Sequence, residues 1–189
     1  MRHKVILSLS LIGIVGLTAC QKSGDAEVAR ALRDVNVVDE SNLNDVMLTV
    51  ADPNEAVNYF ARATANDPGR IDLMRGLAKS QVRAGKPTEA VTTWKAVVAH
   101  AEATNDDRVD LADAQIRAND WEGAEATLNT IPPTHETFER YRLEAMVADS
   151  KENWSKADSF YETAVGLTTK PAGVLNNWGY SKLTRGDYV

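Results

Sequence analysis

Small and large apolar residues recur along this chain at a nearly constant spacing. An alanine returns after 34, 34 and 33 residues, at Ala56, Ala90, Ala124 and Ala157. Four residues after each alanine stands a large side chain: Phe60, Trp94, Leu128 and Tyr161. Seven residues after each alanine stand Ala63, Val97, Ile131 and Ala164. Because offsets of four and seven share one face of an α-helix, the spacing predicts a repeated helical unit.

The residues before each alanine predict where every second helix begins. Four residues before the alanines stand Asp52, Lys86, Asp120 and Asn153. Aspartate and asparagine cap helices because their side chains accept hydrogen bonds from unpaired backbone N–H groups. Proline also suits the first helical position, where Pro53 and Pro87 stand. The helix that holds Ala124 is expected to end at Pro132-Pro133, since proline cannot continue a helix.

These spacings and residue types resemble the tetratricopeptide repeat. Its first-helix pattern is best matched at Leu175, Trp178 and Gly179, and Gly85 and Gly186 stand at its tight turn. The resemblance covers residues 37–189 and implies an all-α solenoid of antiparallel helix pairs, with about four and a half repeats. The repeats are expected near residues 37–70, 71–104, 105–137, 138–170 and 171–189, the last incomplete. Since the chain stops where another helix should start, we expect it to be a fragment of a longer protein.

The amino-terminal segment has the features of a signal peptide, which we assign to residues 1–19. Basic Arg2 and Lys4 precede an apolar run that is short for a membrane span. The following Leu17-Thr18-Ala19-Cys20 resembles a bacterial lipobox, in which the cysteine is acylated and the bond before it is cut. The alternative is an ordinary secretory signal with a chance cysteine.

The lipobox resemblance implies a lipidated protein that begins at Cys20, with acyl chains such as palmitate as its membrane anchor. Gln21 follows in place of aspartate. By resemblance this implies the periplasmic face of the outer membrane. Residues 20–36 are then expected to form a tether and a short lead-in helix.

Charge and side-chain chemistry exclude several classes of function. The net charge of −6 argues against a nucleic-acid partner. The single cysteine excludes an internal disulfide and a multi-cysteine metal site, and the three histidines lie far apart. We find no nucleophile elbow, phosphate-binding loop, zinc-protease motif or pair of catalytic carboxylates. The sequence therefore predicts a protein that is not an enzyme and has neither a metal nor a cofactor.

In the tetratricopeptide family the first helices of the repeats line a groove that holds peptides. The resemblance implies a partner-binding groove with Arg75, Lys79, Arg83, Asp113, Arg117, Arg142, Met146, Asn176 and Tyr180, and with Asp72, Val82, Asp106, Val109, Ile116, Glu139, Asp149, Ser150, Leu183 and Thr184 at equivalent positions. The first three form a basic stripe at i, i+4 and i+8, suited to a partner's carboxylates. The alternative is a solvated helix face with local pairs to Asp72 and Asp113. The four tryptophans are expected to be packing residues.

A lipobox followed by these repeats resembles lipoproteins of pilus and secretion assembly. The stretches 176–180 and 186–188 are similar to late repeats of the Flp (tight-adherence) pilus-assembly lipoproteins. The resemblance implies a protein-binding outer-membrane lipoprotein, similar in role to the pilotins, with secretin or pilus-assembly components as partners. Two alternatives stay open, an envelope scaffold that recruits peptidoglycan hydrolases or outer-membrane assembly factors, and the docking arm of a longer enzyme. The oligomeric state also stays open.

Overall fold

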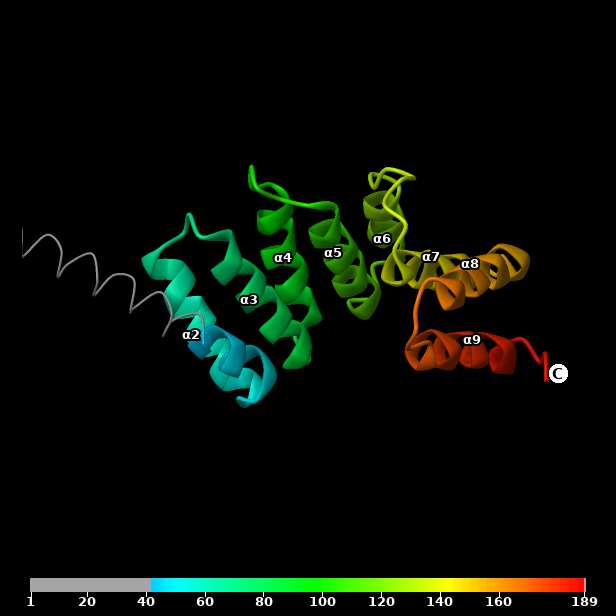
Figure 1. Cartoon of the computed structure of the whole chain (residues 1–189), viewed down its shortest axis with the longest axis horizontal. Coiled ribbons are helices and arrows are strands. Elements are labelled where there is room, and N and C mark those ends of the chain that lie inside the picture. The colour runs from blue at the N-terminus through cyan, green and yellow to red at the C-terminus, as the bar shows by residue number, and fades with distance from the viewer. Residues whose placement is uncertain (1–41, 189) are drawn as a thin grey trace, which may run out of the picture. The chain divides into compact units, whose positions relative to one another are not determined.

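A computed structural model describes residues 42–188, in which every regular element is a helix. A helical segment at residues 42–49 comes first. It is followed by α2 (Pro53–Asn66), α3 (Ile71–Arg83), α4 (Pro87–Val98), α5 (Asn105–Arg117), α6 (Trp121–Leu128), α7 (Phe138–Ser150), α8 (Trp154–Gly166) and α9 (Ala172–Thr184) (Figure 1). The predicted all-α fold is confirmed. The expected signal peptide, Cys20 and the tether lie outside the described residues.

Within residues 44–188 the helices follow one another as a row of pairs. Consecutive helices pack together from α2 to α9, and α7 also contacts α5 and α9 (Figure 1). We call α3, α5, α7 and α9 the A helices and α2, α4, α6 and α8 the B helices. The contacts among α5, α7 and α9 show that these A helices lie in one row. Side chains of neighbouring A helices can therefore form one continuous surface.

The B helices begin where the sequence predicts. The residues that precede them are Asp52, Lys86, Asp120 and Asn153. Three of these side chains accept hydrogen bonds from backbone N–H groups of the first turn, whereas Lys86 forms no such bond. Gly85 and Gly186 have φ angles of 70° and 79° at the turns that follow α3 and α9. This left-handed conformation favours glycine because a side chain would be strained there.

The repeated apolar residues form the core. All four repeated alanines are fully buried, and so, within 3% exposure, are the large residues four positions later. Val97 and Ala164 are also buried, whereas Ala63 is only half-buried in the first pair. The alanines are small enough to let a neighbouring helix approach closely.

Helix α6 is shorter than expected. It ends at Leu128 after 8 residues, whereas the other B helices have 12 to 14. The prediction that it continues to Pro132-Pro133 is therefore wrong. Residues that precede a proline avoid helical angles, and the chain leaves α6 through tight turns in which Thr130 and Ile131 bond three residues back. Ile131 is still buried, but it reaches the core from a turn instead of a helix.

Gly76 of α3 lies so close to a neighbouring helix that a side chain there is expected to be poorly tolerated. A Cβ atom there would lie within 3 Å of the Phe60 ring of α2. We predict that Gly76→Ala destabilises the protein by about 1–2 kcal/mol, because overpacking outweighs the higher helix propensity of alanine. Gly179→Ala in α9 is the matched control, since a Cβ there meets no atom within 4 Å. Urea unfolding should show the control equal to or more stable than the wild type. Equal stability of both variants would contradict the close packing at Gly76.

Candidate functional site

The nine residues predicted for the groove all lie on A helices, and the structure gives those of α3 partners within the chain. Arg75 binds both carboxylate oxygens of Asp107 of α5, through Nε and Nη2 at 2.7 Å each. Arg83 donates to the backbone carbonyls of Met47 and Leu48, in the last turn of the helical segment 42–49. It also donates to the carbonyl of Ala51, just after that segment. The two arginines therefore join α3 to neighbouring elements.

The local pairs considered from the sequence are not the ones that form. Asp72 pairs with Arg70, and Asp113 pairs with Arg117 and Arg142. Lys79, the middle residue of the stripe, lies 4.0 Å from Asp110 of α5. The role of the stripe in partner binding stays a prediction, and Lys79 is more exposed than Arg75.

Asp107 is held ionised although it is almost fully buried. Burial acts most strongly on its pKa and raises it, but the hydrogen bonds from Arg75 and Thr104 outweigh that effect. The pKa of Asp107 therefore lies below its usual value. Thr104 and Asp107 also form a capping box that starts α5. One carboxylate thus serves both the start of α5 and the contact with α3.

The first hollow of the A-helix surface lies between α3 and α5, and we call it the α3–α5 hollow. It has a volume of about 410 Å³ and is lined by Leu48, Lys79, Val82, Arg83, Trp94, Asp110 and Asp113. Burial raises the pKa of Asp110 to about 6, against the opposing effect of Lys79. Because 43% of the Asp110 side chain still meets solvent, the free energy involved is reduced by screening. The hollow thus combines apolar side chains with charges of both signs.

A chain of contacts leads from the α3–α5 hollow to a second one. Asp113 of α5 accepts a hydrogen bond from Arg142 Nη2 of α7 at 3.0 Å. Arg142 Nη1 lies 3.5 Å from the sulfur of Met146, and Asn177 Nδ2 of α9 lies 3.2 Å from the same sulfur. Four of the predicted residues, Asp113, Arg117, Arg142 and Met146, are thereby brought together. Asn177 reaches α7, whereas the predicted neighbour Asn176 is exposed.

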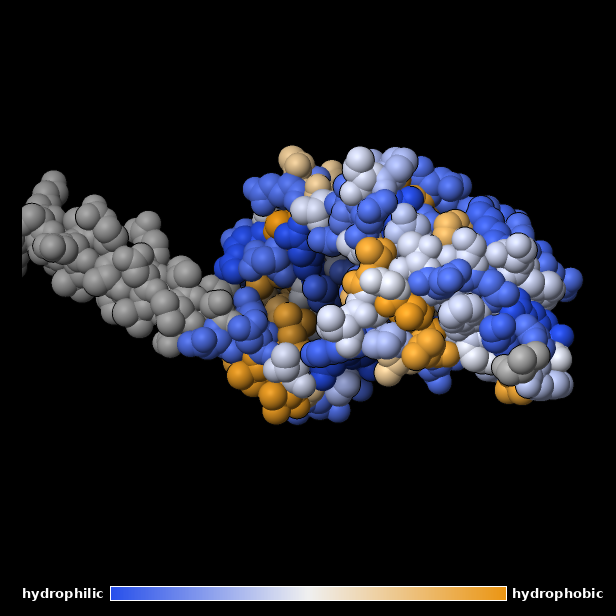
Figure 2. Space-filling model, turned by 45° about the vertical axis from the view of Figure 1, so that its right-hand side comes forward, coloured by the Kyte–Doolittle hydropathy of each residue, from blue (hydrophilic) through white to orange (hydrophobic). Residues whose placement is uncertain are grey.

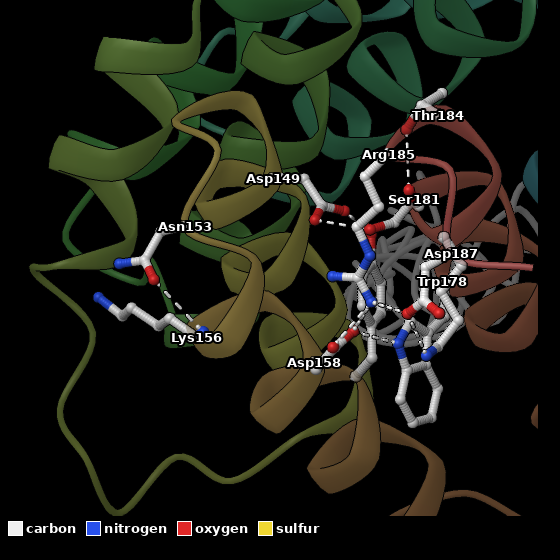
Figure 3. A network of polar contacts seen from close by, with 11 residues as sticks. Asp149, Asn153, Lys156, Asp158, Trp178, Ser181, Thr184, Arg185 and Asp187 are labelled. Atoms are coloured by element: carbon white, nitrogen blue, oxygen red, sulfur yellow. Dashed lines mark hydrogen bonds and ion pairs between the residues drawn. The ribbon is translucent and has the colours of Figure 1, made fainter. Parts of the chain in front are cut away.

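The second hollow lies between α7 and α9, and we call it the α7–α9 hollow. Its volume is about 230 Å³, and its lining residues are Trp121, Met146, Asp149, Ser150, Trp154, Tyr161, Asn177, Tyr180, Ser181 and Thr184. Asp149 accepts a hydrogen bond from the Ser181 hydroxyl group at 2.8 Å (Figure 3). It accepts another from the Tyr161 hydroxyl group at 2.9 Å. Burial raises the pKa of Asp149 above its usual value despite these two bonds.

Two tryptophans of the α7–α9 hollow were expected only to pack, like Tyr161 of the repeated core. Trp121 and Trp154 are the first residues of the B helices α6 and α8, and both are half-buried. The groove positions carried over from the family concern A helices alone, so they could not include these side chains. The one available signal was their shared place, three residues before a repeated alanine.

Polar contacts hold α9 in place beside this hollow. Arg185 Nη2 lies 2.8 Å from both carboxylate oxygens of Asp158 of α8, and it also contacts Asp187 (Figure 3). Trp178 Nε1 donates to the same Asp158 carboxylate at 2.6 Å. These contacts support α9, whose Tyr180 side chain is 68% exposed at the edge of the hollow. In the space-filling view, patches of apolar surface lie directly beside hydrophilic surface (Figure 2).

Comparison with known proteins identifies the fold of this chain through solved structures alone. No protein-family model and no curated protein sequence matches the chain. Among solved structures, the APC/C hetero-tetramer Cut9–Hcn1 is similar with a TM-score of 0.69 and 18% identity over 77% of this chain. MamA residues 41 to the end, from Desulfovibrio magneticus RS-1, give a TM-score of 0.64 and 15% identity over 78% of this chain and 84% of that chain. Cut9 and MamA both contain tetratricopeptide repeats. The fold is a tetratricopeptide-repeat solenoid.

The likeness concerns architecture, since the identities are low. The tetratricopeptide solenoid covers only 29% of the Cut9 complex chain that it matches. In the part of this protein that the structure describes, no helix is both long and apolar enough to cross a membrane. In the same described part, no three or more His, Cys, Asp or Glu side chains group in a way that could hold a metal ion.

Proposed function

We propose that this tetratricopeptide solenoid is a non-enzymatic scaffold that binds another protein along its A helices. The observation that supports this is the pair of hollows on α3, α5, α7 and α9, linked by the Asp113–Arg142 contact. One hollow is charged and the other is aromatic, so a bound segment meets distinct environments along its length. Specific interfaces combine buried aromatic anchors with placed charges in this way.

The bound segment is expected to be an extended or helical stretch of a partner protein. Two hollows of about 410 and 230 Å³ each accommodate side chains, and neither is a deep, closed cavity for a small substrate. The Cut9–Hcn1 structure is itself a hetero-tetramer, so a solenoid of this fold is found there in complex with a second protein.

We also propose that the protein is lipidated at Cys20 and acts at the periplasmic face of the outer membrane, in the assembly of a pilus or secretion system. The lipobox resemblance of residues 17–20 supports the anchor, and the late-repeat resemblance supports the system. Metabolic labelling with an alkyne analogue of palmitate tests the anchor. Label is expected on the native chain and is lost in Cys20→Ala; equal label on both chains would contradict it.

Photo-crosslinking in intact cells tests the binding surface. A photoreactive phenylalanine replaces Tyr180, an exposed aromatic residue of similar shape that lines the α7–α9 hollow. The control places the same group at Glu162, an exposed position of α8 that lines no hollow described above. We expect a captured protein at Tyr180 only, and mass spectrometry to find a secretin or pilus component.

The remaining results discriminate among the alternatives. Capture of peptidoglycan hydrolases or outer-membrane assembly factors at Tyr180 would favour the envelope scaffold over the pilus system. Capture at Glu162 with none at Tyr180 would contradict binding along the A helices.

A further inference from the structure

The α7–α9 hollow combines aromatic walls with a single charge. Of its described lining residues, only Asp149 is charged. The walls include four aromatic side chains, Trp121, Trp154, Tyr161 and Tyr180. Aromatic faces carry negative electrostatic potential, and the carboxylate adds a full negative charge. The hollow is therefore electrostatically suited to a cation.

Asp149 has hydrogen-bond donors but no ion pair among the described residues, and Arg185 acts on its pKa only as a nearby charge that lowers it. Its two donors, Ser181 and Tyr161, are neutral hydroxyl groups. A carboxylate offers about four acceptor sites, so two hydrogen bonds leave room for another donor. A half-buried carboxylate without a cation is destabilised by desolvation, which a bound cation would offset.

Arg185, whose charge acts on Asp149, and Arg142, whose charge acts on Tyr161, are both bound to other carboxylates. Arg142 donates to Asp113. Arg185 binds Asp158 and Asp187, and its guanidinium lies 5.8 Å from the centre of the Trp154 ring. The contact between Arg185 and the Trp154 ring shows that one aromatic wall of this hollow already lies beside a cation. Neither arginine forms an ion pair with Asp149 within the described part of the chain.

We propose that the α7–α9 hollow selects a lysine or arginine side chain of the bound segment, with the cationic group on Asp149 and the aliphatic part against the aromatic walls and Met146. The proposal rests on the binding function proposed above and names the chemistry of one contact. The volume of about 230 Å³ suits one long side chain rather than a small-molecule ligand. Long basic side chains pack their aliphatic part on apolar surface while the charged end finds polar partners.

Pools of fluorescent heptapeptides, acetylated and amidated at their ends, test this selection. Each pool is random except for its central residue, which is Lys, Arg, Leu, Phe or Glu. Binding to the full chain in detergent is followed by fluorescence anisotropy. We expect the Lys and Arg pools to bind about tenfold more tightly than the Leu and Glu pools, a difference typical of one charge-assisted contact.

Asp149→Asn removes the charge and keeps the size of the side chain, and its amide oxygen can still accept a hydrogen bond. We expect the preference for Lys and Arg to fall to about twofold or less, as the charged part of the contact is lost. Glu162→Gln is the control, because Glu162 is exposed on α8 and lines neither hollow. Tyr180→Leu is a second test that leaves the core untouched, and it should also weaken the preference.

The outcomes separate this inference from the proposed function. If no pool binds, the proposed function fails and the selection fails with it. If pools bind without preferring Lys or Arg, or if the preference survives in both Asp149→Asn and Tyr180→Leu, the hollow does not select a cation and the binding function stands.

Discussion

Replacing Arg75 with alanine is expected to reduce the free energy of unfolding by about 3 kcal/mol, which is typical of breaking a buried ion pair. The change leaves the Asp107 carboxylate, whose side chain is 5% exposed, without its cation. Lys79→Ala is the matched control on the same helix face. Its contact with Asp110 is long and exposed, so we expect a loss below about 1 kcal/mol. Urea unfolding at pH 7 measures both.

The same pair predicts a pH dependence. Because the folded state lowers the pKa of Asp107, the ionised carboxylate contributes stability above its unfolded pKa of about 4. This contribution is lost as the pH falls through the lower, folded pKa. The difference in stability between the wild type and Arg75→Ala should therefore be full at pH 7 and shrink well below about pH 4. If Arg75→Ala unfolds like the wild type at pH 7, the ion pair with Asp107 does not stabilise the fold. Arg75 would then be an exposed side chain available to a partner, as the groove prediction assumed.

Trp94→Ala is expected to cost about 3–5 kcal/mol, because it opens a large cavity in the core. Trp94 is 1% exposed and packs in one cluster with Ala78, Ala90 and Val97. Since solenoid repeats depend mainly on their neighbours, we expect the loss to be greatest in the helices around α4. Hydrogen exchange together with urea unfolding measures both its size and its place.

Trp121→Ala is the control for this change. Trp121 is half-buried at the α7–α9 hollow, and its indole nitrogen bonds Asn119 at 2.9 Å. We expect a smaller loss of stability than for Trp94→Ala and weaker photo-crosslinking from Tyr180. Equal losses for the two tryptophans would contradict the different roles that the structure gives them.

The periodic residues predicted the architecture well because a solenoid is built from local repeats. The alanine spacing, the helix starts at Asp52, Asp120 and Asn153, and the buried Trp94 all follow from positions within one repeat. Helix α6 departs from the pattern: Pro132 disfavours helical angles at Ile131, and the chain has already left the helix after Leu128 through tight turns.

The candidate site was predicted less completely than the fold. The sequence placed Arg142, Met146 and Tyr180 on A helices, and all three belong to or border the contacts around the α7–α9 hollow. It could not anticipate Trp121 and Trp154, which enter the same hollow from B helices. Trp121 and Trp154 each stand three residues before a repeated alanine. A tryptophan that recurs at a fixed repeat position fits a core residue as well as one that lines a hollow, so the sequence could not separate the two roles.

The sequence by itself determined the helix-pair solenoid, its capping residues and its repeated core, because these depend on period and on neighbours a few residues away. Only the tertiary structure decided that Arg75 meets Asp107, 32 residues along the chain, and that Asp149 faces an aromatic hollow without a cation. A helical spacing specifies which side chains share a face. Which carboxylate, ring or carbonyl they meet depends on how the next helix crosses, and that is set by packing between helices.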